Sequence, residues 1–253
     1  MLIDKVRSGI RGAISLHKEF GVSYFQLLRS LFKKDKTVTI HIRDLTTIMN
    51  IRKSLLFGYY LWNIEKYGWK IVNNANGLVI YENRQKGIKL FSRINDNWPY
   101  SAAIHEVFVQ EVYKADFKNK VVIDVGAYLG ESAIYFAING AKKVIALEPD
   151  EENYKLALMN IKENGLDNKI VLLNNALAPK EGVINLYRYI SSPNGSSIDL
   201  NNMVKLNDEF LVKQVEAITL DQLRKMASER IGLLKLDCEG CEYSVLNSFL
   251  TLI

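Results

Sequence analysis

Residues 121–132 decide the fold: they read VVIDVGAYLGES, and residues 144–150, which read VIALEPD, complete the same unit. The pattern predicts an apolar strand, a tight glycine turn, a helix and a second strand that ends on Glu148. Such a turn lets a ligand approach backbone amides at a helix N-terminus. An acid at the end of the next strand can accept hydrogen bonds from both ribose hydroxyls. The unit therefore predicts a binding site for a cofactor that contains a nucleoside.

The spacing of the glycines indicates which cofactor binds. A dinucleotide site needs Gly-x-Gly-x-x-Gly, but Asp124 occupies its first position, Leu129 occupies its last, and Gly130 comes one residue late. A carboxylate beside the turn favours a cationic amino-acid ligand over a doubly anionic pyrophosphate. S-adenosylmethionine carries an ammonium and a sulfonium charge, so it is the expected cofactor.

Four later stretches extend this pattern along the chain. They are residues 174–178 followed by Gly182, residues 195–197 (GSS), residues 218–223 (ITLDQL) and residues 234–242 (LKLDCEGCE). Together with the glycine turn, they resemble the FkbM-type family of class I S-adenosylmethionine-dependent methyltransferases. In that family they match the end of the third strand, a serine-bearing loop, a "TLD" helix start and a "KxDxEGxE" signature. The resemblance covers residues from about 77 to about 249.

Alternating strands and helices predict an α/β fold, a Rossmann-like three-layer sandwich with a mostly parallel sheet. We expect this domain to span residues 101–253, after a mixed α/β extension over residues 1–100. The core strands are expected at residues 121–125, 143–147, 170–173 and 233–236, with an antiparallel pair at 183–189 and 213–218. In the extension, we expect a strand at 37–42, helices at 44–60 and 101–113, and short strands at 71–72, 78–81 and 88–91.

The predicted sheet is shortened at its C-terminal end. The resemblance implies three further strands after the last helix, but only four parallel strands are readable. Residues 233–236 would then form an exposed apolar edge, which is unfavourable unless it is covered. We expect N-terminal strands, or a second copy of the chain in a homodimer, to pair along this edge. A chain with neither would be a truncated remnant.

Composition is typical of a soluble enzyme, with 48% hydrophobic and 24% charged residues in a chain of 253. No apolar run is long enough to cross a membrane, and charged residues interrupt the N-terminus where a signal peptide would need an apolar segment. Two cysteines three residues apart cannot cross-link distant segments of the fold. The sequence therefore favours a reducing compartment. We therefore expect a cytoplasmic protein.

The net charge of +5 is concentrated at the N-terminus. Residues 1–36 contain eight Lys or Arg and three Asp or Glu residues, and so account for the whole excess. Helical spacing places Val6, Ile10 and Ile14 on one face. One interpretation is an amphipathic helix packed on the body with a solvated basic face. The other is a surface helix in peripheral contact with anionic lipid or an acidic polymer. Nucleic acid is not expected as a partner, because no nucleic-acid motif accompanies the charge.

The family resemblance implies a cofactor site around the glycine turn. Gly126 and Gly130 would shape the turn, Asp124 and Tyr128 would flank the methionine end, and Glu148 would accept from the ribose. The adenine would lie beside Asn175 and Ala176. Tyr128 replaces a small polar residue that is common in the family.

Candidate catalytic residues lie where the last core strand ends, since open α/β sheets place their sites at the carboxyl ends of strands. They are Lys235, Asp237 and Glu239. Strand alternation puts Lys235 and Asp237 on one face, where pairing would keep Asp237 ionised beside the methyl group. Alternatively, these two form a structural ion pair and Glu239 caps the next helix. No metal is expected, because a second strand that could supply ligands does not follow.

The resemblance implies O-methylation of a hydroxyl on a sugar, glycan or secondary metabolite, with a small-molecule or glycan acceptor. Two alternatives stay open. Cys238 and Cys241 form a C-x-x-C pair between a strand and a helix, as in thiol-disulfide oxidoreductases, although a chance occurrence in the signature is the preferred interpretation. Zinc would need two further ligands. The chain could also be a non-catalytic cofactor-binding remnant.

Overall fold

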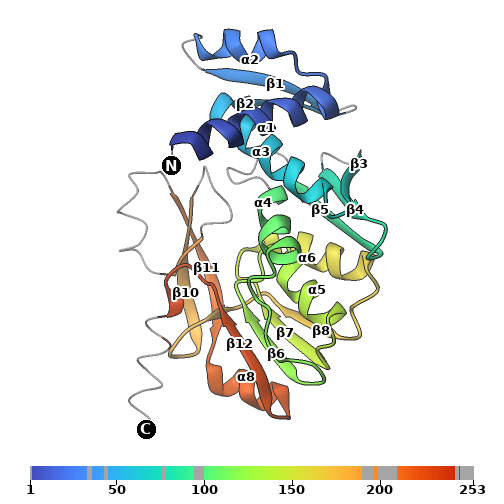
Figure 1. Cartoon of the computed structure of the whole chain (residues 1–253). Helices are drawn as coiled ribbons and strands as arrows, with labels where there is room; N and C mark the ends of the chain where they lie inside the picture. The colour runs from blue at the N-terminus through green and yellow to red at the C-terminus, as the bar shows by residue number, and fades with distance from the viewer. Residues whose placement is uncertain are drawn as a thin grey trace. The chain divides into compact units, whose positions relative to one another are not determined.

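The computed structural model describes residues 2–32, 36–42, 45–75, 78–93, 100–189, 196–198, 210–242 and 245. It divides into two compact units, residues 1–111 and 112–253 (Figure 1). Gly195 of the serine-bearing loop and most of the last helix lie outside the described residues. Within the part described, no helix has the length and apolar character needed to cross a bilayer.

The first unit combines helices with two small antiparallel sheets. Its order is α1 (Leu2–Phe20), α2 (Tyr24–Leu31), β1 (Thr37–Ile42), β2 (Leu45–Asn50), α3 (Ile51–Glu65), β3 (Trp69–Ala75), β4 (Leu78–Asn83), β5 (Ile88–Arg93) and α4 (Tyr100–Ile104). A π-helical turn, His105–Val109, continues α4. The hairpin β1–β2 and the meander β3–β4–β5 form separate sheets. The helix predicted over residues 101–113 therefore begins as expected but ends at Val109.

The helix predicted at residues 44–60 was wrong in its first part. Residues 45–50 form β2, which pairs with β1 from Ile42↔Leu45 to Thr37↔Asn50. Asn50 then caps α3, because its side chain accepts a hydrogen bond from the Arg52 backbone N–H. The apolar spacing of the segment fits a helix, but pairing with the preceding strand and the Asn50 cap delay the helix by seven residues.

The buried face of α1 is not the one that carries Val6 and Ile10. Val6 and Ile10 are exposed, whereas Leu16 and Ser15 are fully buried. The contact with α3 is made through small residues: a Cβ at Gly12 would overlap the carbonyl oxygen of Leu55, and one at Gly58 would overlap the carbonyl oxygen of Gly12. Close backbone approach thus decides which side of α1 is packed, and the side of Val6 and Ile10, which an amphipathic helix packed on the body would bury, is exposed.

The second unit contains the predicted parallel sheet. Its strands are β6 (Val121–Val125), β7 (Lys143–Leu147), β8 (Ile170–Leu173) and β12 (Ile231–Leu236), in the order β12-β6-β7-β8 with every pair parallel. The helices α5 (Glu131–Ile138) and α6 (Glu151–Glu163) lie on one face (Figure 1). On the other face, α8 (Leu220–Ala227) packs Leu223 and Ala227 against alternate residues of β6 and β7. This is a Rossmann-like three-layer arrangement.

A second sheet, in the order β10-β11-β9, is inserted in the chain between the core strands β8 and β12. It consists of β9 (Ala176–Leu177), β10 (Gly182–Tyr189) and β11 (Phe210–Ile218), and the antiparallel pair β10–β11 is the predicted one. Side chains cap the two neighbouring helices α6 and α8. The Asp150 side chain accepts from the backbone N–H groups of Glu152 and Asn153, and Thr219 forms a capping box with Gln222.

Strand β12 lies at the edge of the parallel sheet. Among the described strands, β6 is its one hydrogen-bonded neighbour. The strands of the first unit pair with one another, so the prediction that N-terminal strands cover this edge is wrong for the described residues. Pairing with a second copy of the chain remains a prediction.

The glycine contact between α1 and α3 gives a matched stability test. Gly12→Ala is expected to lower the unfolding free energy by about 1–3 kcal/mol, because the new methyl group meets the α3 backbone. Gly9→Ala, in the same helix, has nothing within 4 Å and is expected to stabilise by up to about 1 kcal/mol. All three tryptophans lie in residues 1–111, so denaturant unfolding followed by tryptophan fluorescence reports this unit. Equal effects of the two substitutions would contradict the close approach.

Candidate functional site

The glycine turn after β6 is built around a position that no side chain can occupy. Gly126 has a φ of +80°, and a Cβ there would overlap the carbonyl oxygen of Asp237. The backbone N–H groups of Gly126 and Ala127 both donate to the Leu147 carbonyl at 3.0 and 2.9 Å. The turn is therefore held between the ends of β7 and β12, at the carboxyl edge of the sheet.

Two further residues of the turn also adopt positive φ angles. Gly130, at +86°, is the N-cap of α5, and Tyr128 has a φ of +49°. The side chain of Asn160 on α6 donates to the Leu129 carbonyl at 2.8 Å. This contact fixes the turn from the helix side, so the N-terminus of α5 is held at the same edge as the strand ends.

Glu148 joins the end of β7 to the glycine turn. Its Oε2 accepts from the Tyr128 backbone N–H at 2.8 Å, and its Oε1 accepts from the Asp150 N–H at 3.0 Å and the Asn153 side chain at 3.4 Å. Burial raises the pKa of Glu148 to about 7, although the donated hydrogen bonds lower it. A carboxyl group has about four lone-pair sites, so three protein donors leave acceptor capacity for one further donor.

Lys235 and Asp124 form a buried ion pair behind the turn. Lys235 Nζ lies 2.9 Å from Asp124 Oδ1, and both side chains are buried. Ser132 Oγ, on α5, donates to Asp124 Oδ2 at 2.6 Å. Burial lowers the pKa of Lys235, but the Asp124 and Asp237 carboxylates outweigh it, and the net pKa is raised. The charge of Asp124 is thus balanced inside the protein.

Lys235 also holds the turn itself. Its Nζ donates to the Gly126 carbonyl at 2.8 Å and to the Val125 carbonyl at 3.4 Å. Asp237, the expected partner of Lys235, lies 3.7 Å away, farther than Asp124. Lys235 is therefore placed inside the sheet edge, where it positions the backbone of the turn.

Asp237 and Glu239 are the exposed carboxylates of this edge. The Asp237 side chain is 56% exposed, and the Tyr113 hydroxyl donates to its Oδ2 at 2.8 Å. Glu239 has a φ of +54°. Partial desolvation raises the pKa of Glu239, and the nearby Asp237 and Glu242 carboxylates raise it further. A raised pKa brings a carboxyl group closer to the range in which it can act as a general base near neutral pH.

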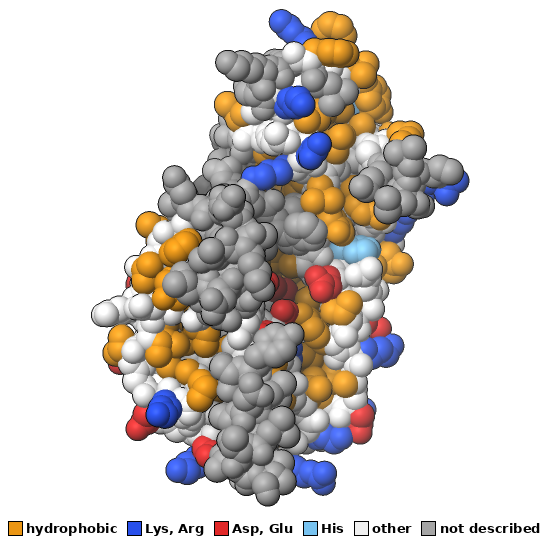
Figure 2. All heavy atoms as spheres, turned by 90° about the vertical axis from the view of Figure 1, so that its left-hand side faces the viewer, with side chains coloured by type: hydrophobic (Ala, Val, Ile, Leu, Met, Phe, Trp, Pro, Cys, Tyr) orange, Lys and Arg blue, Asp and Glu red, His pale blue; other side chains and the backbone are white. Residues whose placement is uncertain are grey.

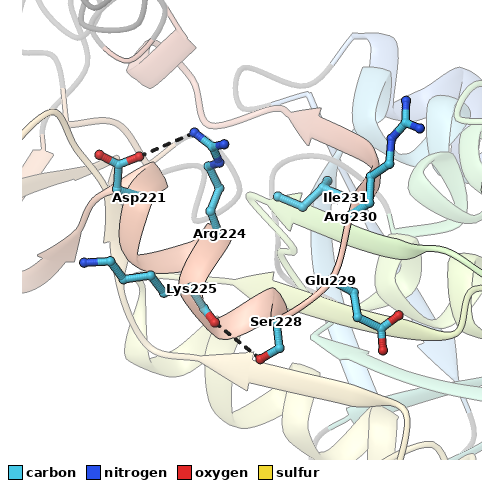
Figure 3. A pocket seen from close by; sticks show the side chains of 7 residues that line it. All are labelled: Asp221, Arg224, Lys225, Ser228, Glu229, Arg230 and Ile231. Atoms are coloured by element: carbon cyan, nitrogen blue, oxygen red, sulfur yellow. Dashed lines mark hydrogen bonds and ion pairs between the residues drawn. The ribbon is translucent and has the colours of Figure 1, made fainter.

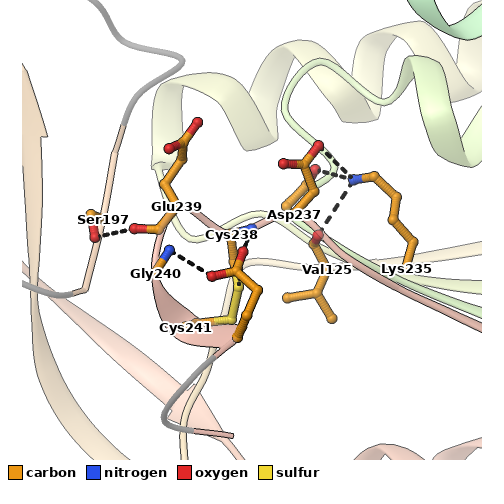
Figure 4. The surroundings of a disulfide bond; sticks show 10 residues. Val125, Ser197, Lys235, Asp237, Cys238, Glu239, Gly240 and Cys241 are labelled. Atoms are coloured by element: carbon orange, nitrogen blue, oxygen red, sulfur yellow. Dashed lines mark hydrogen bonds and ion pairs between the residues drawn. A yellow bond between two sulfur atoms is a disulfide. The ribbon is translucent and has the colours of Figure 1, made fainter. Parts of the chain in front are cut away.

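A disulfide bond joins Cys238 and Cys241 in the turn that follows β12 (Figure 4). Glu242 fastens the same turn, since its two carboxylate oxygens accept from the backbone N–H groups of Cys238 and Gly240, each at 2.8 Å. Ser197 Oγ donates to the Glu239 carbonyl. The two side chains of the C-x-x-C pair are thus brought into bonding contact, and the interpretation of the pair as a chance occurrence in the signature stays a prediction.

Asn174 and its neighbours occupy the end of β8. The Asn174 side chain donates to the carbonyls of Glu148 and Pro149 at 2.8 and 3.1 Å. Asn175 reaches the Glu216 carbonyl at 3.4 Å, and Ala176 is buried in β9 opposite Ala217. A pocket of about 390 Å³ opens beside these strand ends, lined by Pro149, Glu151, Asn174, Lys213, Gln214, Val215 and Glu216. The predicted adenine neighbours Asn175 and Ala176 are not among its lining residues.

A larger pocket, of about 710 Å³, lies at the opposite end of β12 (Figure 3). It is lined by α8 and the segment that leads into β12, with Asp221 and Arg224 paired at 3.8 Å. None of the predicted site residues lines it. Because the glycine turn lies at the carboxyl edge of the sheet, this pocket is separate from the candidate cofactor site.

Several residues of the site were not anticipated from the sequence. Tyr113 donates a hydrogen bond to Asp237, Ser132 donates to Asp124, and Asn153 donates to Glu148. Asn174 donates to the Glu148 carbonyl at the end of β7, and Glu242 accepts from the Cys238 backbone N–H. Ser132, Asn174 and Glu242 stand inside the motifs quoted above, so the motifs already pointed to their neighbourhood. No sequence pattern around Tyr113 indicates its role, because Tyr113 and Asp237 are far apart in the sequence and the fold alone brings them together.

The profile of the family described as "Methyltransferase FkbM domain" matches residues 124–251. That match covers half of the chain. The chain belongs to the FkbM methyltransferase domain family. The matched residues begin at Asp124 and include the glycine turn, Glu148, Lys235 and Asp237, so the site lies within the family's domain.

Individual relatives resemble only parts of the FkbM chain. A ribosomal protein L11 methyltransferase from Carboxydothermus hydrogenoformans is 45% identical over 58 residues, which are 23% of this chain and 19% of that protein. A methyltransferase FkbM structure from Methylobacillus flagellatus KT shares 15% identity, with a TM-score of 0.37, over 56% of this chain and 32% of that one. A putative transferase, PH0793, from Pyrococcus horikoshii shares 22% identity, with a TM-score of 0.37, over 66% and 63%. The chain thus spans about a fifth of the curated relative it matches.

The buried ion pair is expected to show strong coupling. Lys235→Met leaves the Asp124 carboxylate buried without its cation, which is expected to cost about 3–5 kcal/mol of unfolding free energy. Adding Asp124→Asn removes that charge, so the double variant is expected to be more stable than the sum of the single changes predicts, by about 1–3 kcal/mol. Denaturant unfolding followed by circular dichroism measures all four proteins of the cycle. Additive effects would show that the pair contributes no coupling.

Glu148 predicts a specific pH dependence of stability. Its pKa is raised from 4.5 to about 7 in the folded protein, so the native state binds this proton more tightly than the unfolded state. The resulting stabilisation is present below pH 4.5 and is lost as the pH rises through 7, a change of about 3 kcal/mol. The difference in unfolding free energy between wild type and Glu148→Gln should fall by this amount from pH 4 to pH 8. A difference that does not vary with pH would contradict the prediction.

Proposed function

We propose that the chain is an S-adenosylmethionine-dependent methyltransferase that methylates a hydroxyl group. The observation that carries the proposal is the contact between Glu148 and the glycine turn. The carboxylate at the end of β7 accepts the Tyr128 N–H at 2.8 Å, so the ribose acceptor and the turn form one wall at the carboxyl edge of the sheet. Membership of the FkbM methyltransferase domain family supports the same reaction class.

The residues of this edge fit such a cofactor. Gly126 and Gly130 supply the positive φ angles that the turn needs, and Gly126 also lets the turn approach the Asp237 backbone closely. The N-terminus of α5 points to the same edge. Glu148 would accept from the ribose, and the pocket beside Pro149 and Asn174 would take the adenine. Asp124 lies next to the turn, but Lys235 neutralises it, so it would act by shaping the turn rather than by offering a free charge.

Asp237 is the proposed general base. Bound S-adenosylmethionine would supply an electrophilic methyl group, and a hydroxyl acceptor reacts faster when a nearby group takes its proton. Asp237 is exposed at the strand end and is oriented by the Tyr113 hydroxyl, so it can face an incoming acceptor. Glu239 lies two residues away with a raised pKa and is the second candidate for this role. Lys235 would position the turn and the two strand ends.

The proposed acceptor is a hydroxyl on a sugar, glycan or secondary metabolite. This class rests on the family resemblance alone. A homodimer that covers the β12 edge is proposed on the same footing, because an unpaired parallel edge strand is a poor end for a sheet.

A second candidate function is thiol-disulfide exchange at Cys238 and Cys241. The disulfide bond between them favours it, with Cys238 half-buried and Cys241 fully buried. The Glu242 carboxylate lies 3.4 Å from the Cys238 sulfur, and a neighbouring negative charge disfavours the thiolate that exchange requires. The parallel sheet and the cofactor turn favour the methyltransferase instead.

Calorimetric titration with S-adenosylmethionine tests the proposal. Wild type is expected to bind, and Glu148→Ala is expected to weaken binding at least tenfold, a loss of about 1.4 kcal/mol. Glu229→Ala removes an exposed acid that pairs with Lys142 and lines the separate pocket, so it controls for net charge and should bind like wild type.

The other outcomes separate the alternatives. A folded wild type that does not bind S-adenosylmethionine would overturn the methyltransferase proposal, and disulfide reduction lost in a Cys238→Ser/Cys241→Ser variant would then favour the second candidate. Binding without methyl transfer to any member of a panel of hydroxylated sugars and metabolites would favour the non-catalytic remnant.

A further inference from the structure

The outward sides of α1 and α2 carry large apolar side chains. On α1, Val6 and Ile10 are 54% and 55% exposed. On and just after α2, Phe25 is 72% exposed, Leu28 is 58% exposed and Phe32 is 89% exposed. Single exposed apolar residues are normal on protein surfaces, but a set of five on two neighbouring helices needs a physical explanation.

These residues form stripes. At 3.6 residues per turn, positions three or four apart lie on the same side of a helix. Val6 and Ile10 therefore share one side of α1, opposite the buried Gly12 and Leu16. On α2, Phe25, Leu28 and Phe32 share the side opposite the buried Leu27 and Ser30. Each helix thus buries one side in the first unit and presents an apolar stripe on the other.

The two stripes adjoin. His17 lies on the same side of α1 as Val6 and Ile10 by its spacing, and its ring lies 4.8 Å from the ring of Tyr24, at the start of α2. Tyr24 is itself 47% exposed and lies one turn before Leu28. The His17–Tyr24 contact therefore joins the stripes of α1 and α2 into one surface, which we call the α1–α2 face.

Basic side chains border this face. Arg7 and Arg11 follow Val6 and Ile10 by one residue on α1, and Arg29 follows Leu28 on α2; all three are exposed. Figure 2 shows hydrophobic and Lys or Arg side chains next to one another over the first unit, in the upper part of the view. Between residues 6 and 32, Glu19 is the single acid, and it pairs with Lys18 at 2.9 Å. The face is therefore apolar along its stripes and positively charged along its border.

We propose that the α1–α2 face binds the surface of a lipid bilayer that contains anionic lipid. Helices of this kind lie in the plane of the interface, with the apolar side in the boundary between headgroups and acyl chains and the basic side chains against the headgroups. Phe25, Leu28 and Phe32 would enter that boundary, while Arg7, Arg11 and Arg29 would meet the phosphates. The charge favours a membrane over an apolar protein partner, because each Lys or Arg near an anionic surface strengthens binding roughly fivefold.

The test is co-sedimentation of the full chain with large unilamellar vesicles. Vesicles of phosphatidylcholine with one quarter phosphatidylglycerol are expected to bind the chain, and pure phosphatidylcholine vesicles are expected to bind it at least tenfold more weakly. Binding to the anionic vesicles should weaken further in high salt, which screens the attraction.

Two variants separate the apolar and the charged contributions. Phe25→Ser/Phe32→Ser changes two side chains that are exposed in the first unit, so the fold should be retained, and binding should fall at least tenfold. Arg7→Glu/Arg29→Glu should abolish the preference for anionic lipid. The matched control is Val183→Ser/Val212→Ser, which alters apolar residues of the second unit that are 64% and 54% exposed and should leave binding within twofold of wild type.

Three results would overturn the proposal. One is a wild type that binds neither vesicle type. Another is a loss of binding in the control variant as large as that in the phenylalanine variant. The third is self-association in analytical ultracentrifugation that the phenylalanine variant removes, without vesicle binding by the wild type; this would identify the α1–α2 face as an interface between copies of the chain.

Discussion

The buried ion pair between Lys235 and Asp124 is the interaction on which the second unit depends. It joins neighbouring strands where β6 and β12 reach the carboxyl edge of the sheet. The same ammonium group donates to the Gly126 carbonyl, so one charge determines where the glycine turn lies. A buried ion pair is tolerated only when both charged groups also make their hydrogen bonds. Here Ser132 donates to the Asp124 carboxylate, and the turn carbonyls accept from the Lys235 ammonium group. The exposed negative charge at this edge consequently comes from Asp237 and Glu239.

Glu148 links the second half of the site to the first. Its carboxylate holds the Tyr128 N–H of the turn and the Asp150 N–H at the start of α6, while Asp150 caps α6 through its own side chain. Strand, turn and helix are thus connected through two acids that are two residues apart. Burial makes ionisation of Glu148 costly, as its raised pKa indicates. Perturbed pKa values of this kind are common at functional sites.

The first unit follows a different principle. Close backbone contact through Gly12 and Gly58 determines which side of α1 is buried, and Val6 and Ile10 are left on the other side. The exposed apolar side chains of the α1–α2 face contribute no burial free energy in the isolated unit. Insertion into a lipid surface would bury them. The basic border of the α1–α2 face points to the same partner, since apolar and positively charged groups together match an anionic bilayer.

The sequence by itself determined the strand, glycine turn and helix of the second unit, the order of its elements, and the caps at Asp150 and Thr219. These features depend on hydrogen bonds and side-chain spacing within a few residues, which a local pattern records. Only the tertiary structure decided that Lys235 pairs more closely with Asp124 than with Asp237, that Tyr113 orients Asp237, and that residues 45–50 form a strand. It also decided which side of α1 is buried. Each of these depends on groups brought together from separate segments of the chain, and the spacing of residues along one segment carries no information about its partners.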